Sequence, residues 1–371
     1  MAVLARLRAN LRSARLLYQR LRARGRGRLG TLLWRMPQAL AVRAYRKLAY
    51  AVNDGVLQRW VTPGRFRRFQ AGLDGKLGGH LYVIVMPQTL HFLLPCLGLV
   101  APEARIVLLL NGAQQWEADL LRERFPGLAQ FRVATLPWSS VGHGSMINLL
   151  LRNNDRDFGL LDHDLYLFDK TVLARLHFNH DEFLLCLLSD ASTDGTWAYP
   201  LTHFLYFRVE VFHRLMQCYG VGAQSYRNVP EPARSRLAAI GLRAGATMKS
   251  YHDFFDTLHV LIALAYADGF EAAQIGLASQ EGVYHVGGTS VGTHHTKDLA
   301  HIYIHLRFLE LAGEPLLERR YAAMAAPFSR ASELRGSAAT TAYAVQQIRV
   351  ADAMIERLRQ ARATTRPERT T

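Results

Sequence analysis

The sequence predicts an α/β fold built on a mostly parallel sheet, with helical extensions at both ends. Three observations predict it. Short, continuously apolar runs suit strands that are covered on both faces, and amphipathic stretches lie between them. Gly, Pro and Asn mark the change from one pattern to the next. The resulting β-α-β-α-β-α-β order from residue 80 onward implies parallel strands joined by helices.

Each predicted element follows from a local pattern. The apolar runs predict strands over 81–86, 104–110, 130–136 and 158–162. Helices are expected over 90–100, 113–125 and 143–154, the second closed by Pro126-Gly127 and the third begun at a Gly-Ser cap. A last amphipathic helix is predicted within 332–362, and residues 363–371 have a composition typical of disorder.

The positive charge is concentrated in the first part of the chain. Of 45 Lys and Arg, 17 occur up to Gln70, together with one acid, Asp54, so the rest holds 28 basic and 29 acidic residues. The sequence therefore predicts a basic helical arm over 1–75, a catalytic domain over 76–310, and C-terminal helices with a tail over 311–371. No stretch is suited to span a membrane, because Pro and polar residues interrupt the most apolar one, 80–100.

The arm has the pattern of a cationic amphipathic helix. Its apolar positions, spaced three and four apart, are Leu4, Leu7, Leu11, Ala14, Tyr18 and Leu21, and arginines occupy the other faces. Such a helix fits an anionic membrane surface, which we expect residues 1–60 to bind. Packing against a partner helix, nucleic-acid binding and an organellar transit peptide remain alternatives. No secretory leader is recognisable, and the odd count of three cysteines without C-x-x-C spacing favours a reduced, cytoplasmic protein.

The stretch "FGLLDHDLYLFD" ends a buried strand with two carboxylates. On an extended chain Asp162 and Asp164 point to the same face, beyond the carboxyl end of a strand, where α/β sheets bind ligands. Their repulsion would raise one pKa unless a cation lies between them. Mg²⁺ or Mn²⁺, which prefer oxygen ligands and also bind diphosphates, would remove that cost. A turn or helix-cap role for a lone D-x-D is the simpler alternative.

The order of motifs from about Leu81 to Thr296 resembles the GT-A type of glycosyltransferase, particularly the family 2-like group. The segments that carry the resemblance are "VIVMPQT", "IVLLLNG", "HGSMINLLL", "FGLLDHD", "THFLYFRVEVFHRL", "YHDFFDTLHVLIALAYADGF" and "VYHVGGTS". The resemblance implies a GT-A nucleotide-diphospho-sugar transferase fold, Rossmann-like, with a nucleotide-sugar donor and Mn²⁺ or Mg²⁺ as cofactor.

The resemblance also implies roles for individual residues. The metal ligands would be Asp162, Asp164 and His285. The substrate-binding residues would be Pro87, Thr89, Asn111, Gly112, Asn148, Asp162, Gly287 and Gly288. The general base that deprotonates the acceptor hydroxyl would be Asp253 or Asp256.

These inferences predict a cytoplasmic glycosyltransferase, peripherally attached to the inner face of the membrane. It would move a sugar from a nucleotide-diphosphate donor to a lipid-linked or polysaccharide acceptor, and no specific nucleic acid is expected as a partner. One alternative is a divalent-metal hydrolase built from a set of His and Asp residues: His143, Asp162, His163, Asp164, His177, His180, Asp181 and His285. The other is a non-catalytic adaptor at the membrane surface with a degenerate transferase domain.

Overall fold

The computed structural model describes residues 40–41, 44–73, 80–191, 198–242, 255–287, 289, 299–321 and 338–365. The chain divides into two compact units, residues 1–52 and 53–371. In the first unit, residues 44–52 are helical. The second unit contains the sheet and the candidate functional site. The predicted boundaries at 75 and 310 stay a prediction, and most of the predicted arm lies outside the described residues.

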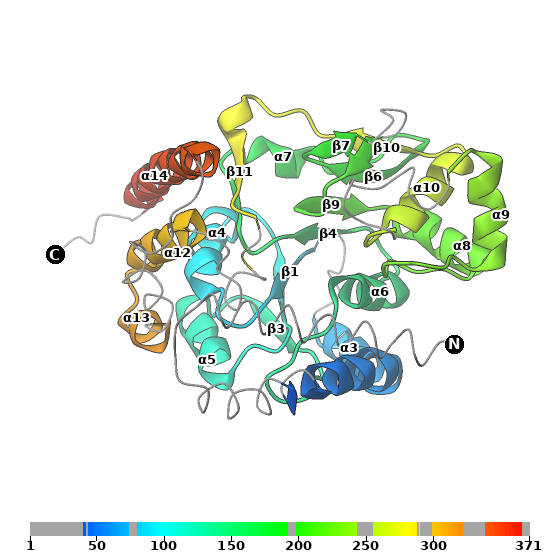
Figure 1. The fold of residues 1–371 in the computed structure, drawn as a ribbon, viewed down its shortest axis with the longest axis horizontal. Coiled ribbons are helices and arrows are strands. Elements are labelled where there is room, and N and C mark those ends of the chain that lie inside the picture. Colours follow the sequence, from blue (N-terminus) through cyan, green and yellow to red (C-terminus); the bar gives the residue numbers. More distant parts are fainter. Residues whose placement is uncertain are drawn as a thin grey trace. The chain divides into compact units, whose positions relative to one another are not determined.

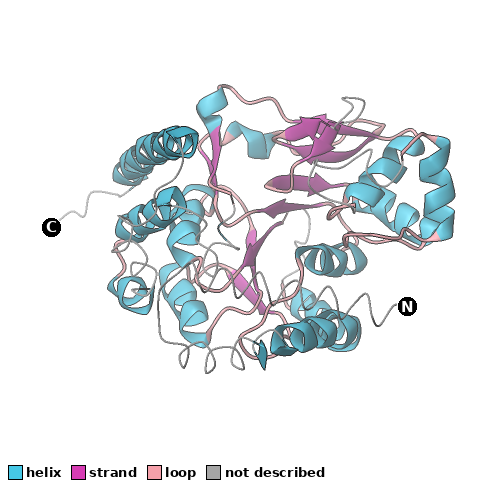
Figure 2. Cartoon of the chain, viewed as in Figure 1, coloured by secondary structure: helices cyan, strands magenta, loops and turns pink. Residues whose placement is uncertain are grey.

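The second unit is built on a seven-stranded, mostly parallel sheet with the order β10-β6-β9-β4-β1-β2-β3 (Figures 1 and 2). The strands are β1 (Leu81–Val85), β2 (Ile106–Leu110), β3 (Ala129–Arg132), β4 (Phe158–Leu161), β6 (Glu182–Cys186), β9 (Phe204–Phe207) and β10 (Glu271–Gln274). Only β9 runs antiparallel to both of its neighbours. The prediction of an α/β fold with a mostly parallel sheet is therefore confirmed.

Helices connect and cover the strands. They are η1 (Asn53–Val61), α3 (Thr62–Ala71), α4 (Leu90–Val100), α5 (Gln115–Arg124), α6 (His143–Asn153), α7 (Thr171–Ala174), α8 (Val209–Tyr219), α9 (Glu231–Ala239), α10 (His259–Ala267), η2 (Gln280–Gly282), α12 (Leu299–Ala312), α13 (Pro315–Tyr321) and α14 (Ala338–Thr365). Two short ribbons, β5 (Leu165–Leu167) with β11 (Val283–His285) and β7 (Ser189–Ala191) with β8 (Ala198–Pro200), lie outside the main sheet.

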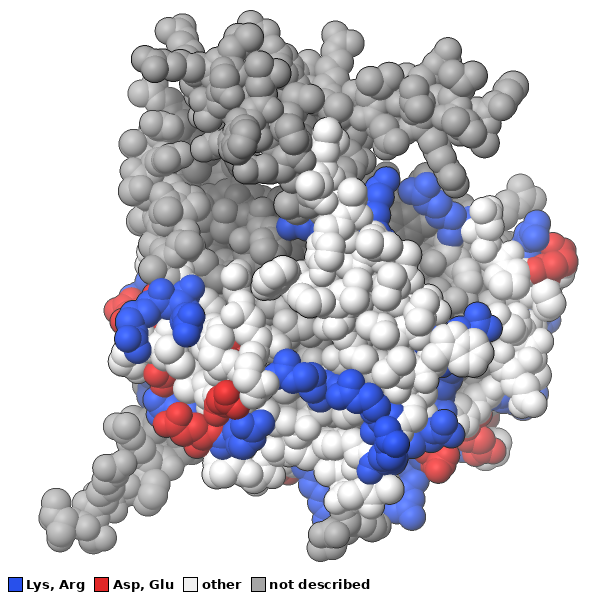
Figure 3. Space-filling view, turned by 90° about the horizontal axis from the view of Figure 1, so that it is seen from below, with Lys and Arg blue, Asp and Glu red and all other residues white. Residues whose placement is uncertain are grey.

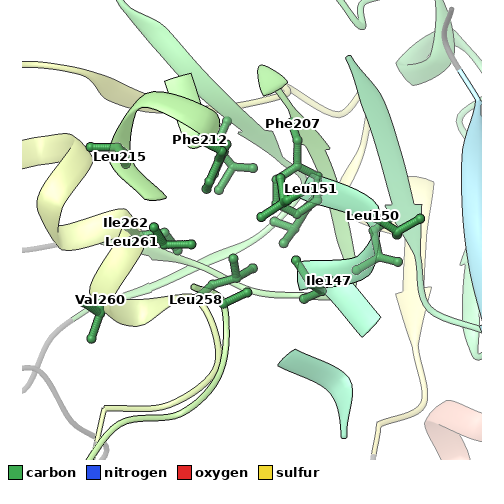
Figure 4. Packing of buried hydrophobic residues seen from close by; sticks show 14 of the residues in the cluster. Ile147, Leu150, Leu151, Phe207, Phe212, Leu215, Leu258, Val260, Leu261 and Ile262 are labelled. Carbon is green, nitrogen blue, oxygen red and sulfur yellow. The ribbon is translucent and has the colours of Figure 1, made fainter. Parts of the chain in front are cut away.

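Both faces of the sheet are buried, which explains the continuous apolar runs. Alternate residues of β1 belong to two separate clusters: Tyr82 and Ile84 to one, Leu81, Val83 and Val85 to the other. Figure 4 shows the first cluster, where side chains of α6, α8 and α10 pack around Phe207 of β9. The second cluster is covered by α4, α5, α12 and α14.

The strand order positions the site. From β1 the chain proceeds to β2 and β3 on one side, and then returns to place β4 on the other side of β1. This reversal between β1 and β4 is a topological switch point, where α/β sheets bind ligands beyond the carboxyl ends of the strands. The loops that follow β1 and β4 therefore define the edge at which a site is expected.

A buried pair of histidines joins α12 to α4. The ring nitrogens His91 Nε2 and His305 Nδ1 are 2.9 Å apart, among the rings of Phe92, Phe308 and Tyr321. Burial, and to a smaller extent the neighbouring His305, holds the pKa of His91 well below its ordinary value of 6.5. Hence His91 stays neutral in the folded protein.

This pair predicts a loss of stability in acid. Below pH 6.5 the unfolded chain binds a proton at His91 that the folded protein does not, so the free energy of unfolding should fall by about 1.4 kcal/mol per pH unit. The contribution of the pair is fully present above pH 6.5. Chemical unfolding between pH 7.5 and 5.5 should show a shallower decline for the His91→Leu/His305→Leu variant. The exposed-histidine control, His180→Leu, should follow the parent, and equal slopes for all three proteins would contradict the assignment.

Candidate functional site

Asp162 and His203 come together through the antiparallel pairing of β4 with β9. Leu161 pairs with Phe204 at the end of this ladder, and the amide of Asp162 donates to the carbonyl of His203 at 2.8 Å. The two residues are thus directly opposite each other, which is the closest side-chain relationship between two strands. Asp162 Oδ2 and His203 Nδ1 are 3.7 Å apart.

A second antiparallel pairing brings in His285. After Asp162 the chain makes a turn, in which the amide of Leu165 donates to the Asp162 carbonyl, and continues as β5. Leu165 of β5 pairs with His285 of β11. His285 Nε2 lies 3.8 Å from Asp162 Oδ2, and its ring stacks on that of His203 with centroids 3.5 Å apart.

Asp162, His203 and His285 form a group that fits a metal ion. One ligand atom from each lies within 4.8 Å of the others. Two donor atoms 3.7–3.8 Å apart can both lie about 2.1 Å from one ion, a normal metal–nitrogen or metal–oxygen distance. Nδ1 of His203 is buried and has no hydrogen-bond partner among the described residues, so this nitrogen is available to ligate an ion. The residues present therefore fit a divalent metal.

Asp164 is buried and is held by a different set of partners. Its Oδ2 accepts hydrogen bonds from the amide of Gly287 at 3.1 Å and from the Thr289 hydroxyl at 2.8 Å, and its Oδ1 lies 3.3 Å from His285 Nε2. Burial opposes ionisation, but His163, His285 and the Thr289 hydrogen bond outweigh it and hold the pKa of Asp164 below its ordinary value. The carboxylate is thus ionised and serves as an anchor for the segment after β11.

The two aspartates do not extend from one face of a strand as the sequence predicted. β4 ends at Leu161, and Asp162 to Leu165 form a turn. Asp162 consequently lies at the opening of the site, where a quarter of its side chain is exposed, whereas Asp164 points into the protein. Both carboxylates still approach the same imidazole, His285. The expected rise in one pKa through mutual repulsion does not occur at Asp164, because positive and hydrogen-bonding groups surround it.

The pKa of His285 responds to both carboxylates. Burial lowers it, but the hydrogen bond and charge of Asp164 and the charge of Asp162 dominate, and the pKa is raised above its ordinary value. Because imidazole ligates metals only as the neutral form, an ion at this site competes with a proton on His285.

Two more histidines lie around this group. His163 Nε2 is 2.8 Å from the Thr289 hydroxyl, which in turn donates to Asp164, so the three side chains form one buried chain. His143 begins α6 and lies close enough to Asp162 and Asp256 for both charges to affect it. Burial nevertheless lowers the pKa of His143 below its ordinary value.

Asp256, one of the two predicted general bases, is not on a helix. It follows the Tyr226–Phe255 bridge, three residues before α10 begins, and its Oδ1 accepts from the amide of Thr257 at 2.8 Å. A helical face shared with Asp253 is therefore not available, and Asp253 itself lies outside the described residues. The charge of Asp256 favours the protonated form of His143, as does that of Asp162, although burial outweighs both.

The predicted donor-binding residues after β2 have structural partners. Asn111 is buried, with its amide donating to the Val141 carbonyl at 2.9 Å and its carbonyl accepting from the Val141 amide at 2.7 Å. Gly112 has φ +82°, and a Cβ there would come within 2.3 Å of the Ser139 carbonyl oxygen. Only glycine suits both the conformation and the close approach. The two residues fix the segment 139–141 against the end of β2.

The loop after β1 is fixed by a carboxylate that sequence reasoning missed. Thr89 is buried and its hydroxyl donates to the Met86 carbonyl, and Gln88, between it and Pro87, has φ +61°. The Gln88 amide donates to Glu117 Oε1 at 2.7 Å. Burial raises the pKa of Glu117, while hydrogen bonds from Tyr321 and two backbone amides favour its charged form.

The remaining predicted substrate residues have different environments. Asn148 on α6 accepts from the Ala223 amide and donates to Gln224, and thus secures the segment before Tyr226. Gly287 has φ +74°, and its amide donates a hydrogen bond to Asp164 Oδ2. Gly288 lies outside the described residues. None of these contacts tests whether the predicted residues bind substrate, so their binding role stays a prediction.

Sequence reasoning did not identify His203 or Thr289 as members of the site. Both lie in segments that carry the resemblance to GT-A transferases, "THFLYFRVEVFHRL" and "VYHVGGTS", but neither residue was assigned a role there. No local signal marks them, because their positions depend on pairings between residues that are distant in sequence. His177, His180 and Asp181 of the hydrolase alternative are not part of the metal-ligand group found among the described residues.

The different environments of the two aspartates predict different effects on stability. Asp164→Asn removes an ionised acceptor from buried hydrogen bonds and should lower the free energy of unfolding by about 2 kcal/mol in the metal-free protein. Asp162→Asn, which is partly exposed, should change it by less than about 0.5 kcal/mol. Urea unfolding in the presence of a chelator measures both. Thr289→Val should reproduce part of the Asp164→Asn loss, and a larger loss for Asp162→Asn would contradict the assignment.

Comparisons with known proteins give a coarse identification. Residues 59–212 match the family model of the StrH glycosyltransferase N-terminal domain. No curated protein sequence matches the chain significantly. Among solved structures, the apo form of the WbbM bifunctional glycosyltransferase aligns at 11% identity and a TM-score of 0.28, over 40% of this chain and 35% of that chain, a likeness too low to carry an argument. The match of residues 59–212, which contain Asp162 and His203, supports a glycosyltransferase.

Proposed function

We propose that this chain is a metal-assisted glycosyltransferase of the GT-A type. It transfers a sugar from a nucleotide-diphosphate donor to a lipid-linked or polysaccharide acceptor. The observation that carries the proposal is the Asp162, His203 and His285 group. It lies beyond the carboxyl end of β4, beside the switch point between β1 and β4, and two of its three members fall in the segment that matches the glycosyltransferase model.

In this proposal the diphosphate of the donor lies next to Asp162, His203 and His285. These three residues would hold Mn²⁺ or Mg²⁺, and the two imidazoles would favour Mn²⁺ because nitrogen ligands suit transition metals better than they suit magnesium. The chemistry that such an ion would supply is neutralisation of the charge that develops on the leaving nucleoside diphosphate. Asp164, the second carboxylate of the D-x-D motif, acts indirectly by anchoring Gly287 and Thr289 after β11.

The loops after β1 and β2 form the proposed donor site. Asn111 and Gly112 bind the segment 139–141 tightly, and Glu117 fixes the loop that contains Pro87 and Thr89. Loops at the carboxyl edge that are held by such contacts would keep their backbone groups in place for a nucleotide. Substrate contacts by these residues, by Asn148 and by Gly287 and Gly288 belong to the proposal.

Asp256 or Asp253 is the proposed general base. A carboxylate that removes the acceptor hydroxyl proton must lie within reach of the acceptor as it attacks the sugar. The charges of Asp256 and of Asp162, a proposed metal ligand, both act on His143, whose pKa burial holds below its ordinary value. An imidazole between two carboxylates can orient the acceptor or pass the proton on.

We place the reaction at the cytoplasmic face of a membrane. The basic arm, with its apolar stripe from Leu4 to Leu21, supports this through attraction to anionic lipids. No helix of the described residues is long and apolar enough to cross a bilayer. A lipid-linked acceptor would be presented to the site by the same surface.

Donor binding should depend on the metal ligands. Thermal unfolding would be followed with nucleotides and nucleotide sugars, each with and without Mn²⁺. A donor at about 100 times its dissociation constant should stabilise the parent by about 2.7 kcal/mol. Asp162→Ala and His203→Ala should lose the metal-dependent part. The control His180→Ala, exposed and outside the group, should keep it.

A shift with Mn²⁺ alone, and none with any nucleotide, would contradict the transferase and favour a hydrolase. Mn²⁺ should support the donor shift at lower concentrations than Mg²⁺ does, and the difference should shrink in His203→Ala. An equal preference for both ions in the parent would argue against imidazole ligation.

Removal of the general base should separate catalysis from binding. Once a donor is identified, Asp256→Asn should lower kcat by about 10²- to 10⁴-fold and leave the donor-induced thermal shift unchanged. Asp155→Asn, an exposed carboxylate in the turn before β4, is the control and should retain full activity. Full activity in Asp256→Asn would assign the base to another residue, with Asp253→Asn the next variant to measure.

A further inference from the structure

The second unit carries an exposed aromatic surface formed by η1, α3 and the loop before α6. The buried positions of the two consecutive helices, Asn53, Thr62, Phe66 and Gln70, face the protein. On the other side, Trp60 is 73% exposed and Val56 49% exposed. In the loop, Trp138 is 90% exposed. Exposed large apolar side chains on neighbouring elements are typical of interaction surfaces.

Hydrogen bonds join the two elements that carry these side chains. Asn53 donates to the Ser139 hydroxyl at 2.9 Å and to the Ser140 carbonyl at 3.1 Å, and it accepts from the Leu136 amide at 2.9 Å. Gln58 donates to the Ala134 carbonyl. The loop that contains Trp138 is therefore fixed along η1 through Asn53 and Gln58, and η1 also carries Trp60.

Trp138 is held outward at a conformational cost. Its φ of +50° lies in the left-handed region, which a bulky L residue seldom adopts. Strain of this kind persists where the surroundings impose it, and it is concentrated at functional positions. Here the strained backbone directs the indole of Trp138 toward solvent, where it has little packing against the described residues.

The charge of this surface is uniformly positive. Between residues 55 and 73 there are four arginines and no acid, and residues 133–142 contain no acid either. Arg59 lies over the ring of Trp60 at 5.5 Å, and Arg68 is exposed on the outer side of α3. Asp54, the acid of η1, lies against Gly142 and Ser145 instead. Seen from the side on which α3 lies, Lys and Arg cross a largely uncharged surface and the acids lie toward its margins (Figure 3).

We propose that this surface, defined by Val56, Arg59, Trp60, Val61, Arg68 and Trp138, docks the second unit onto an anionic lipid bilayer. Tryptophan prefers the headgroup region, where its ring is buried and its N–H stays hydrated. The arginines attract anionic headgroups. The inference rests on the proposed membrane role. It assigns lipid contact to residues of the unit that carries the site, in addition to the contact expected of the apolar stripe from Leu4 to Leu21.

The docking surface adjoins the proposed donor loop. Ser139, next to Trp138, makes the close approach to Gly112 at the end of β2. Docking would therefore bring the carboxyl edge of the sheet near the lipid headgroups, where a lipid-linked acceptor is located. The occupant that best matches indoles flanked by arginines is an anionic membrane.

Vesicle flotation with the full-length protein tests the proposal, using phosphatidylglycerol–phosphatidylcholine vesicles and pure phosphatidylcholine vesicles. To isolate this surface, the measurement uses a background in which the arm arginines Arg8, Arg12, Arg15 and Arg22 are changed to Gln. Trp60→Ser/Trp138→Gly should raise the apparent Kd for anionic vesicles about tenfold or more, as should Arg59→Gln/Arg68→Gln. The controls, Trp116→Phe on α5 and Arg234→Gln on α9, should bind as the background does.

Quenching by brominated lipids gives a direct second readout. The fluorescence lost on binding should fall clearly in Trp60→Phe/Trp138→Phe and stay unchanged in Trp116→Phe. Equal quenching or equal binding in all variants would overturn the proposal, as would equal binding to neutral vesicles. Loss of oligonucleotide binding, with vesicle binding unchanged, would assign the surface to nucleic acid and also overturn it. Neither readout uses a donor or activity, so failure here is distinct from failure of the proposed transferase.

Discussion

The antiparallel insertion of β9 next to β4 is the constraint on which the site depends. If β9 were parallel like its neighbours, its first residue would lie at the opposite edge of the sheet. Because it is antiparallel, His203 begins the strand where β4 ends, and it faces Asp162 across the ladder. A shift of one residue in this register would turn the His203 side chain to the other face and dissolve the group.

The pairing of β11 with β5 adds His285 to the site, which the pairing of β4 with β9 does not contain. β11 returns from far along the chain to pair with β5, and so places His285 between Asp162 and Asp164. Asp164 then anchors the residues that follow β11 through Gly287 and Thr289. The two carboxylates of the D-x-D motif therefore differ in their surroundings. Asp162 is partly exposed and lies beside His203, whereas Asp164 is buried and accepts hydrogen bonds from Gly287 and Thr289.

The sequence predicted the parts of the fold that depend on local pattern. The four apolar runs became β1, β2, β3 and β4, because burial on both faces of a sheet is visible within a few residues. The three stretches predicted as helices became α4, α5 and α6. His203 and Thr289 could not be found in this way, since long-range antiparallel pairings position them. The turn at Asp162, which separates the two carboxylates, also follows from that tertiary arrangement and not from strand periodicity.

Locating a metal ion in the protein would show whether Asp162, His203 and His285 ligate it. Crystals soaked in Mn²⁺ would be measured for anomalous scattering. We expect a peak within about 2.1–2.3 Å of Asp162 Oδ2, His203 Nδ1 and His285 Nε2, with Asp164 still bound to Gly287 and Thr289. A peak ligated by Asp164 without His203, or no peak near β4 at full soaking, would contradict it.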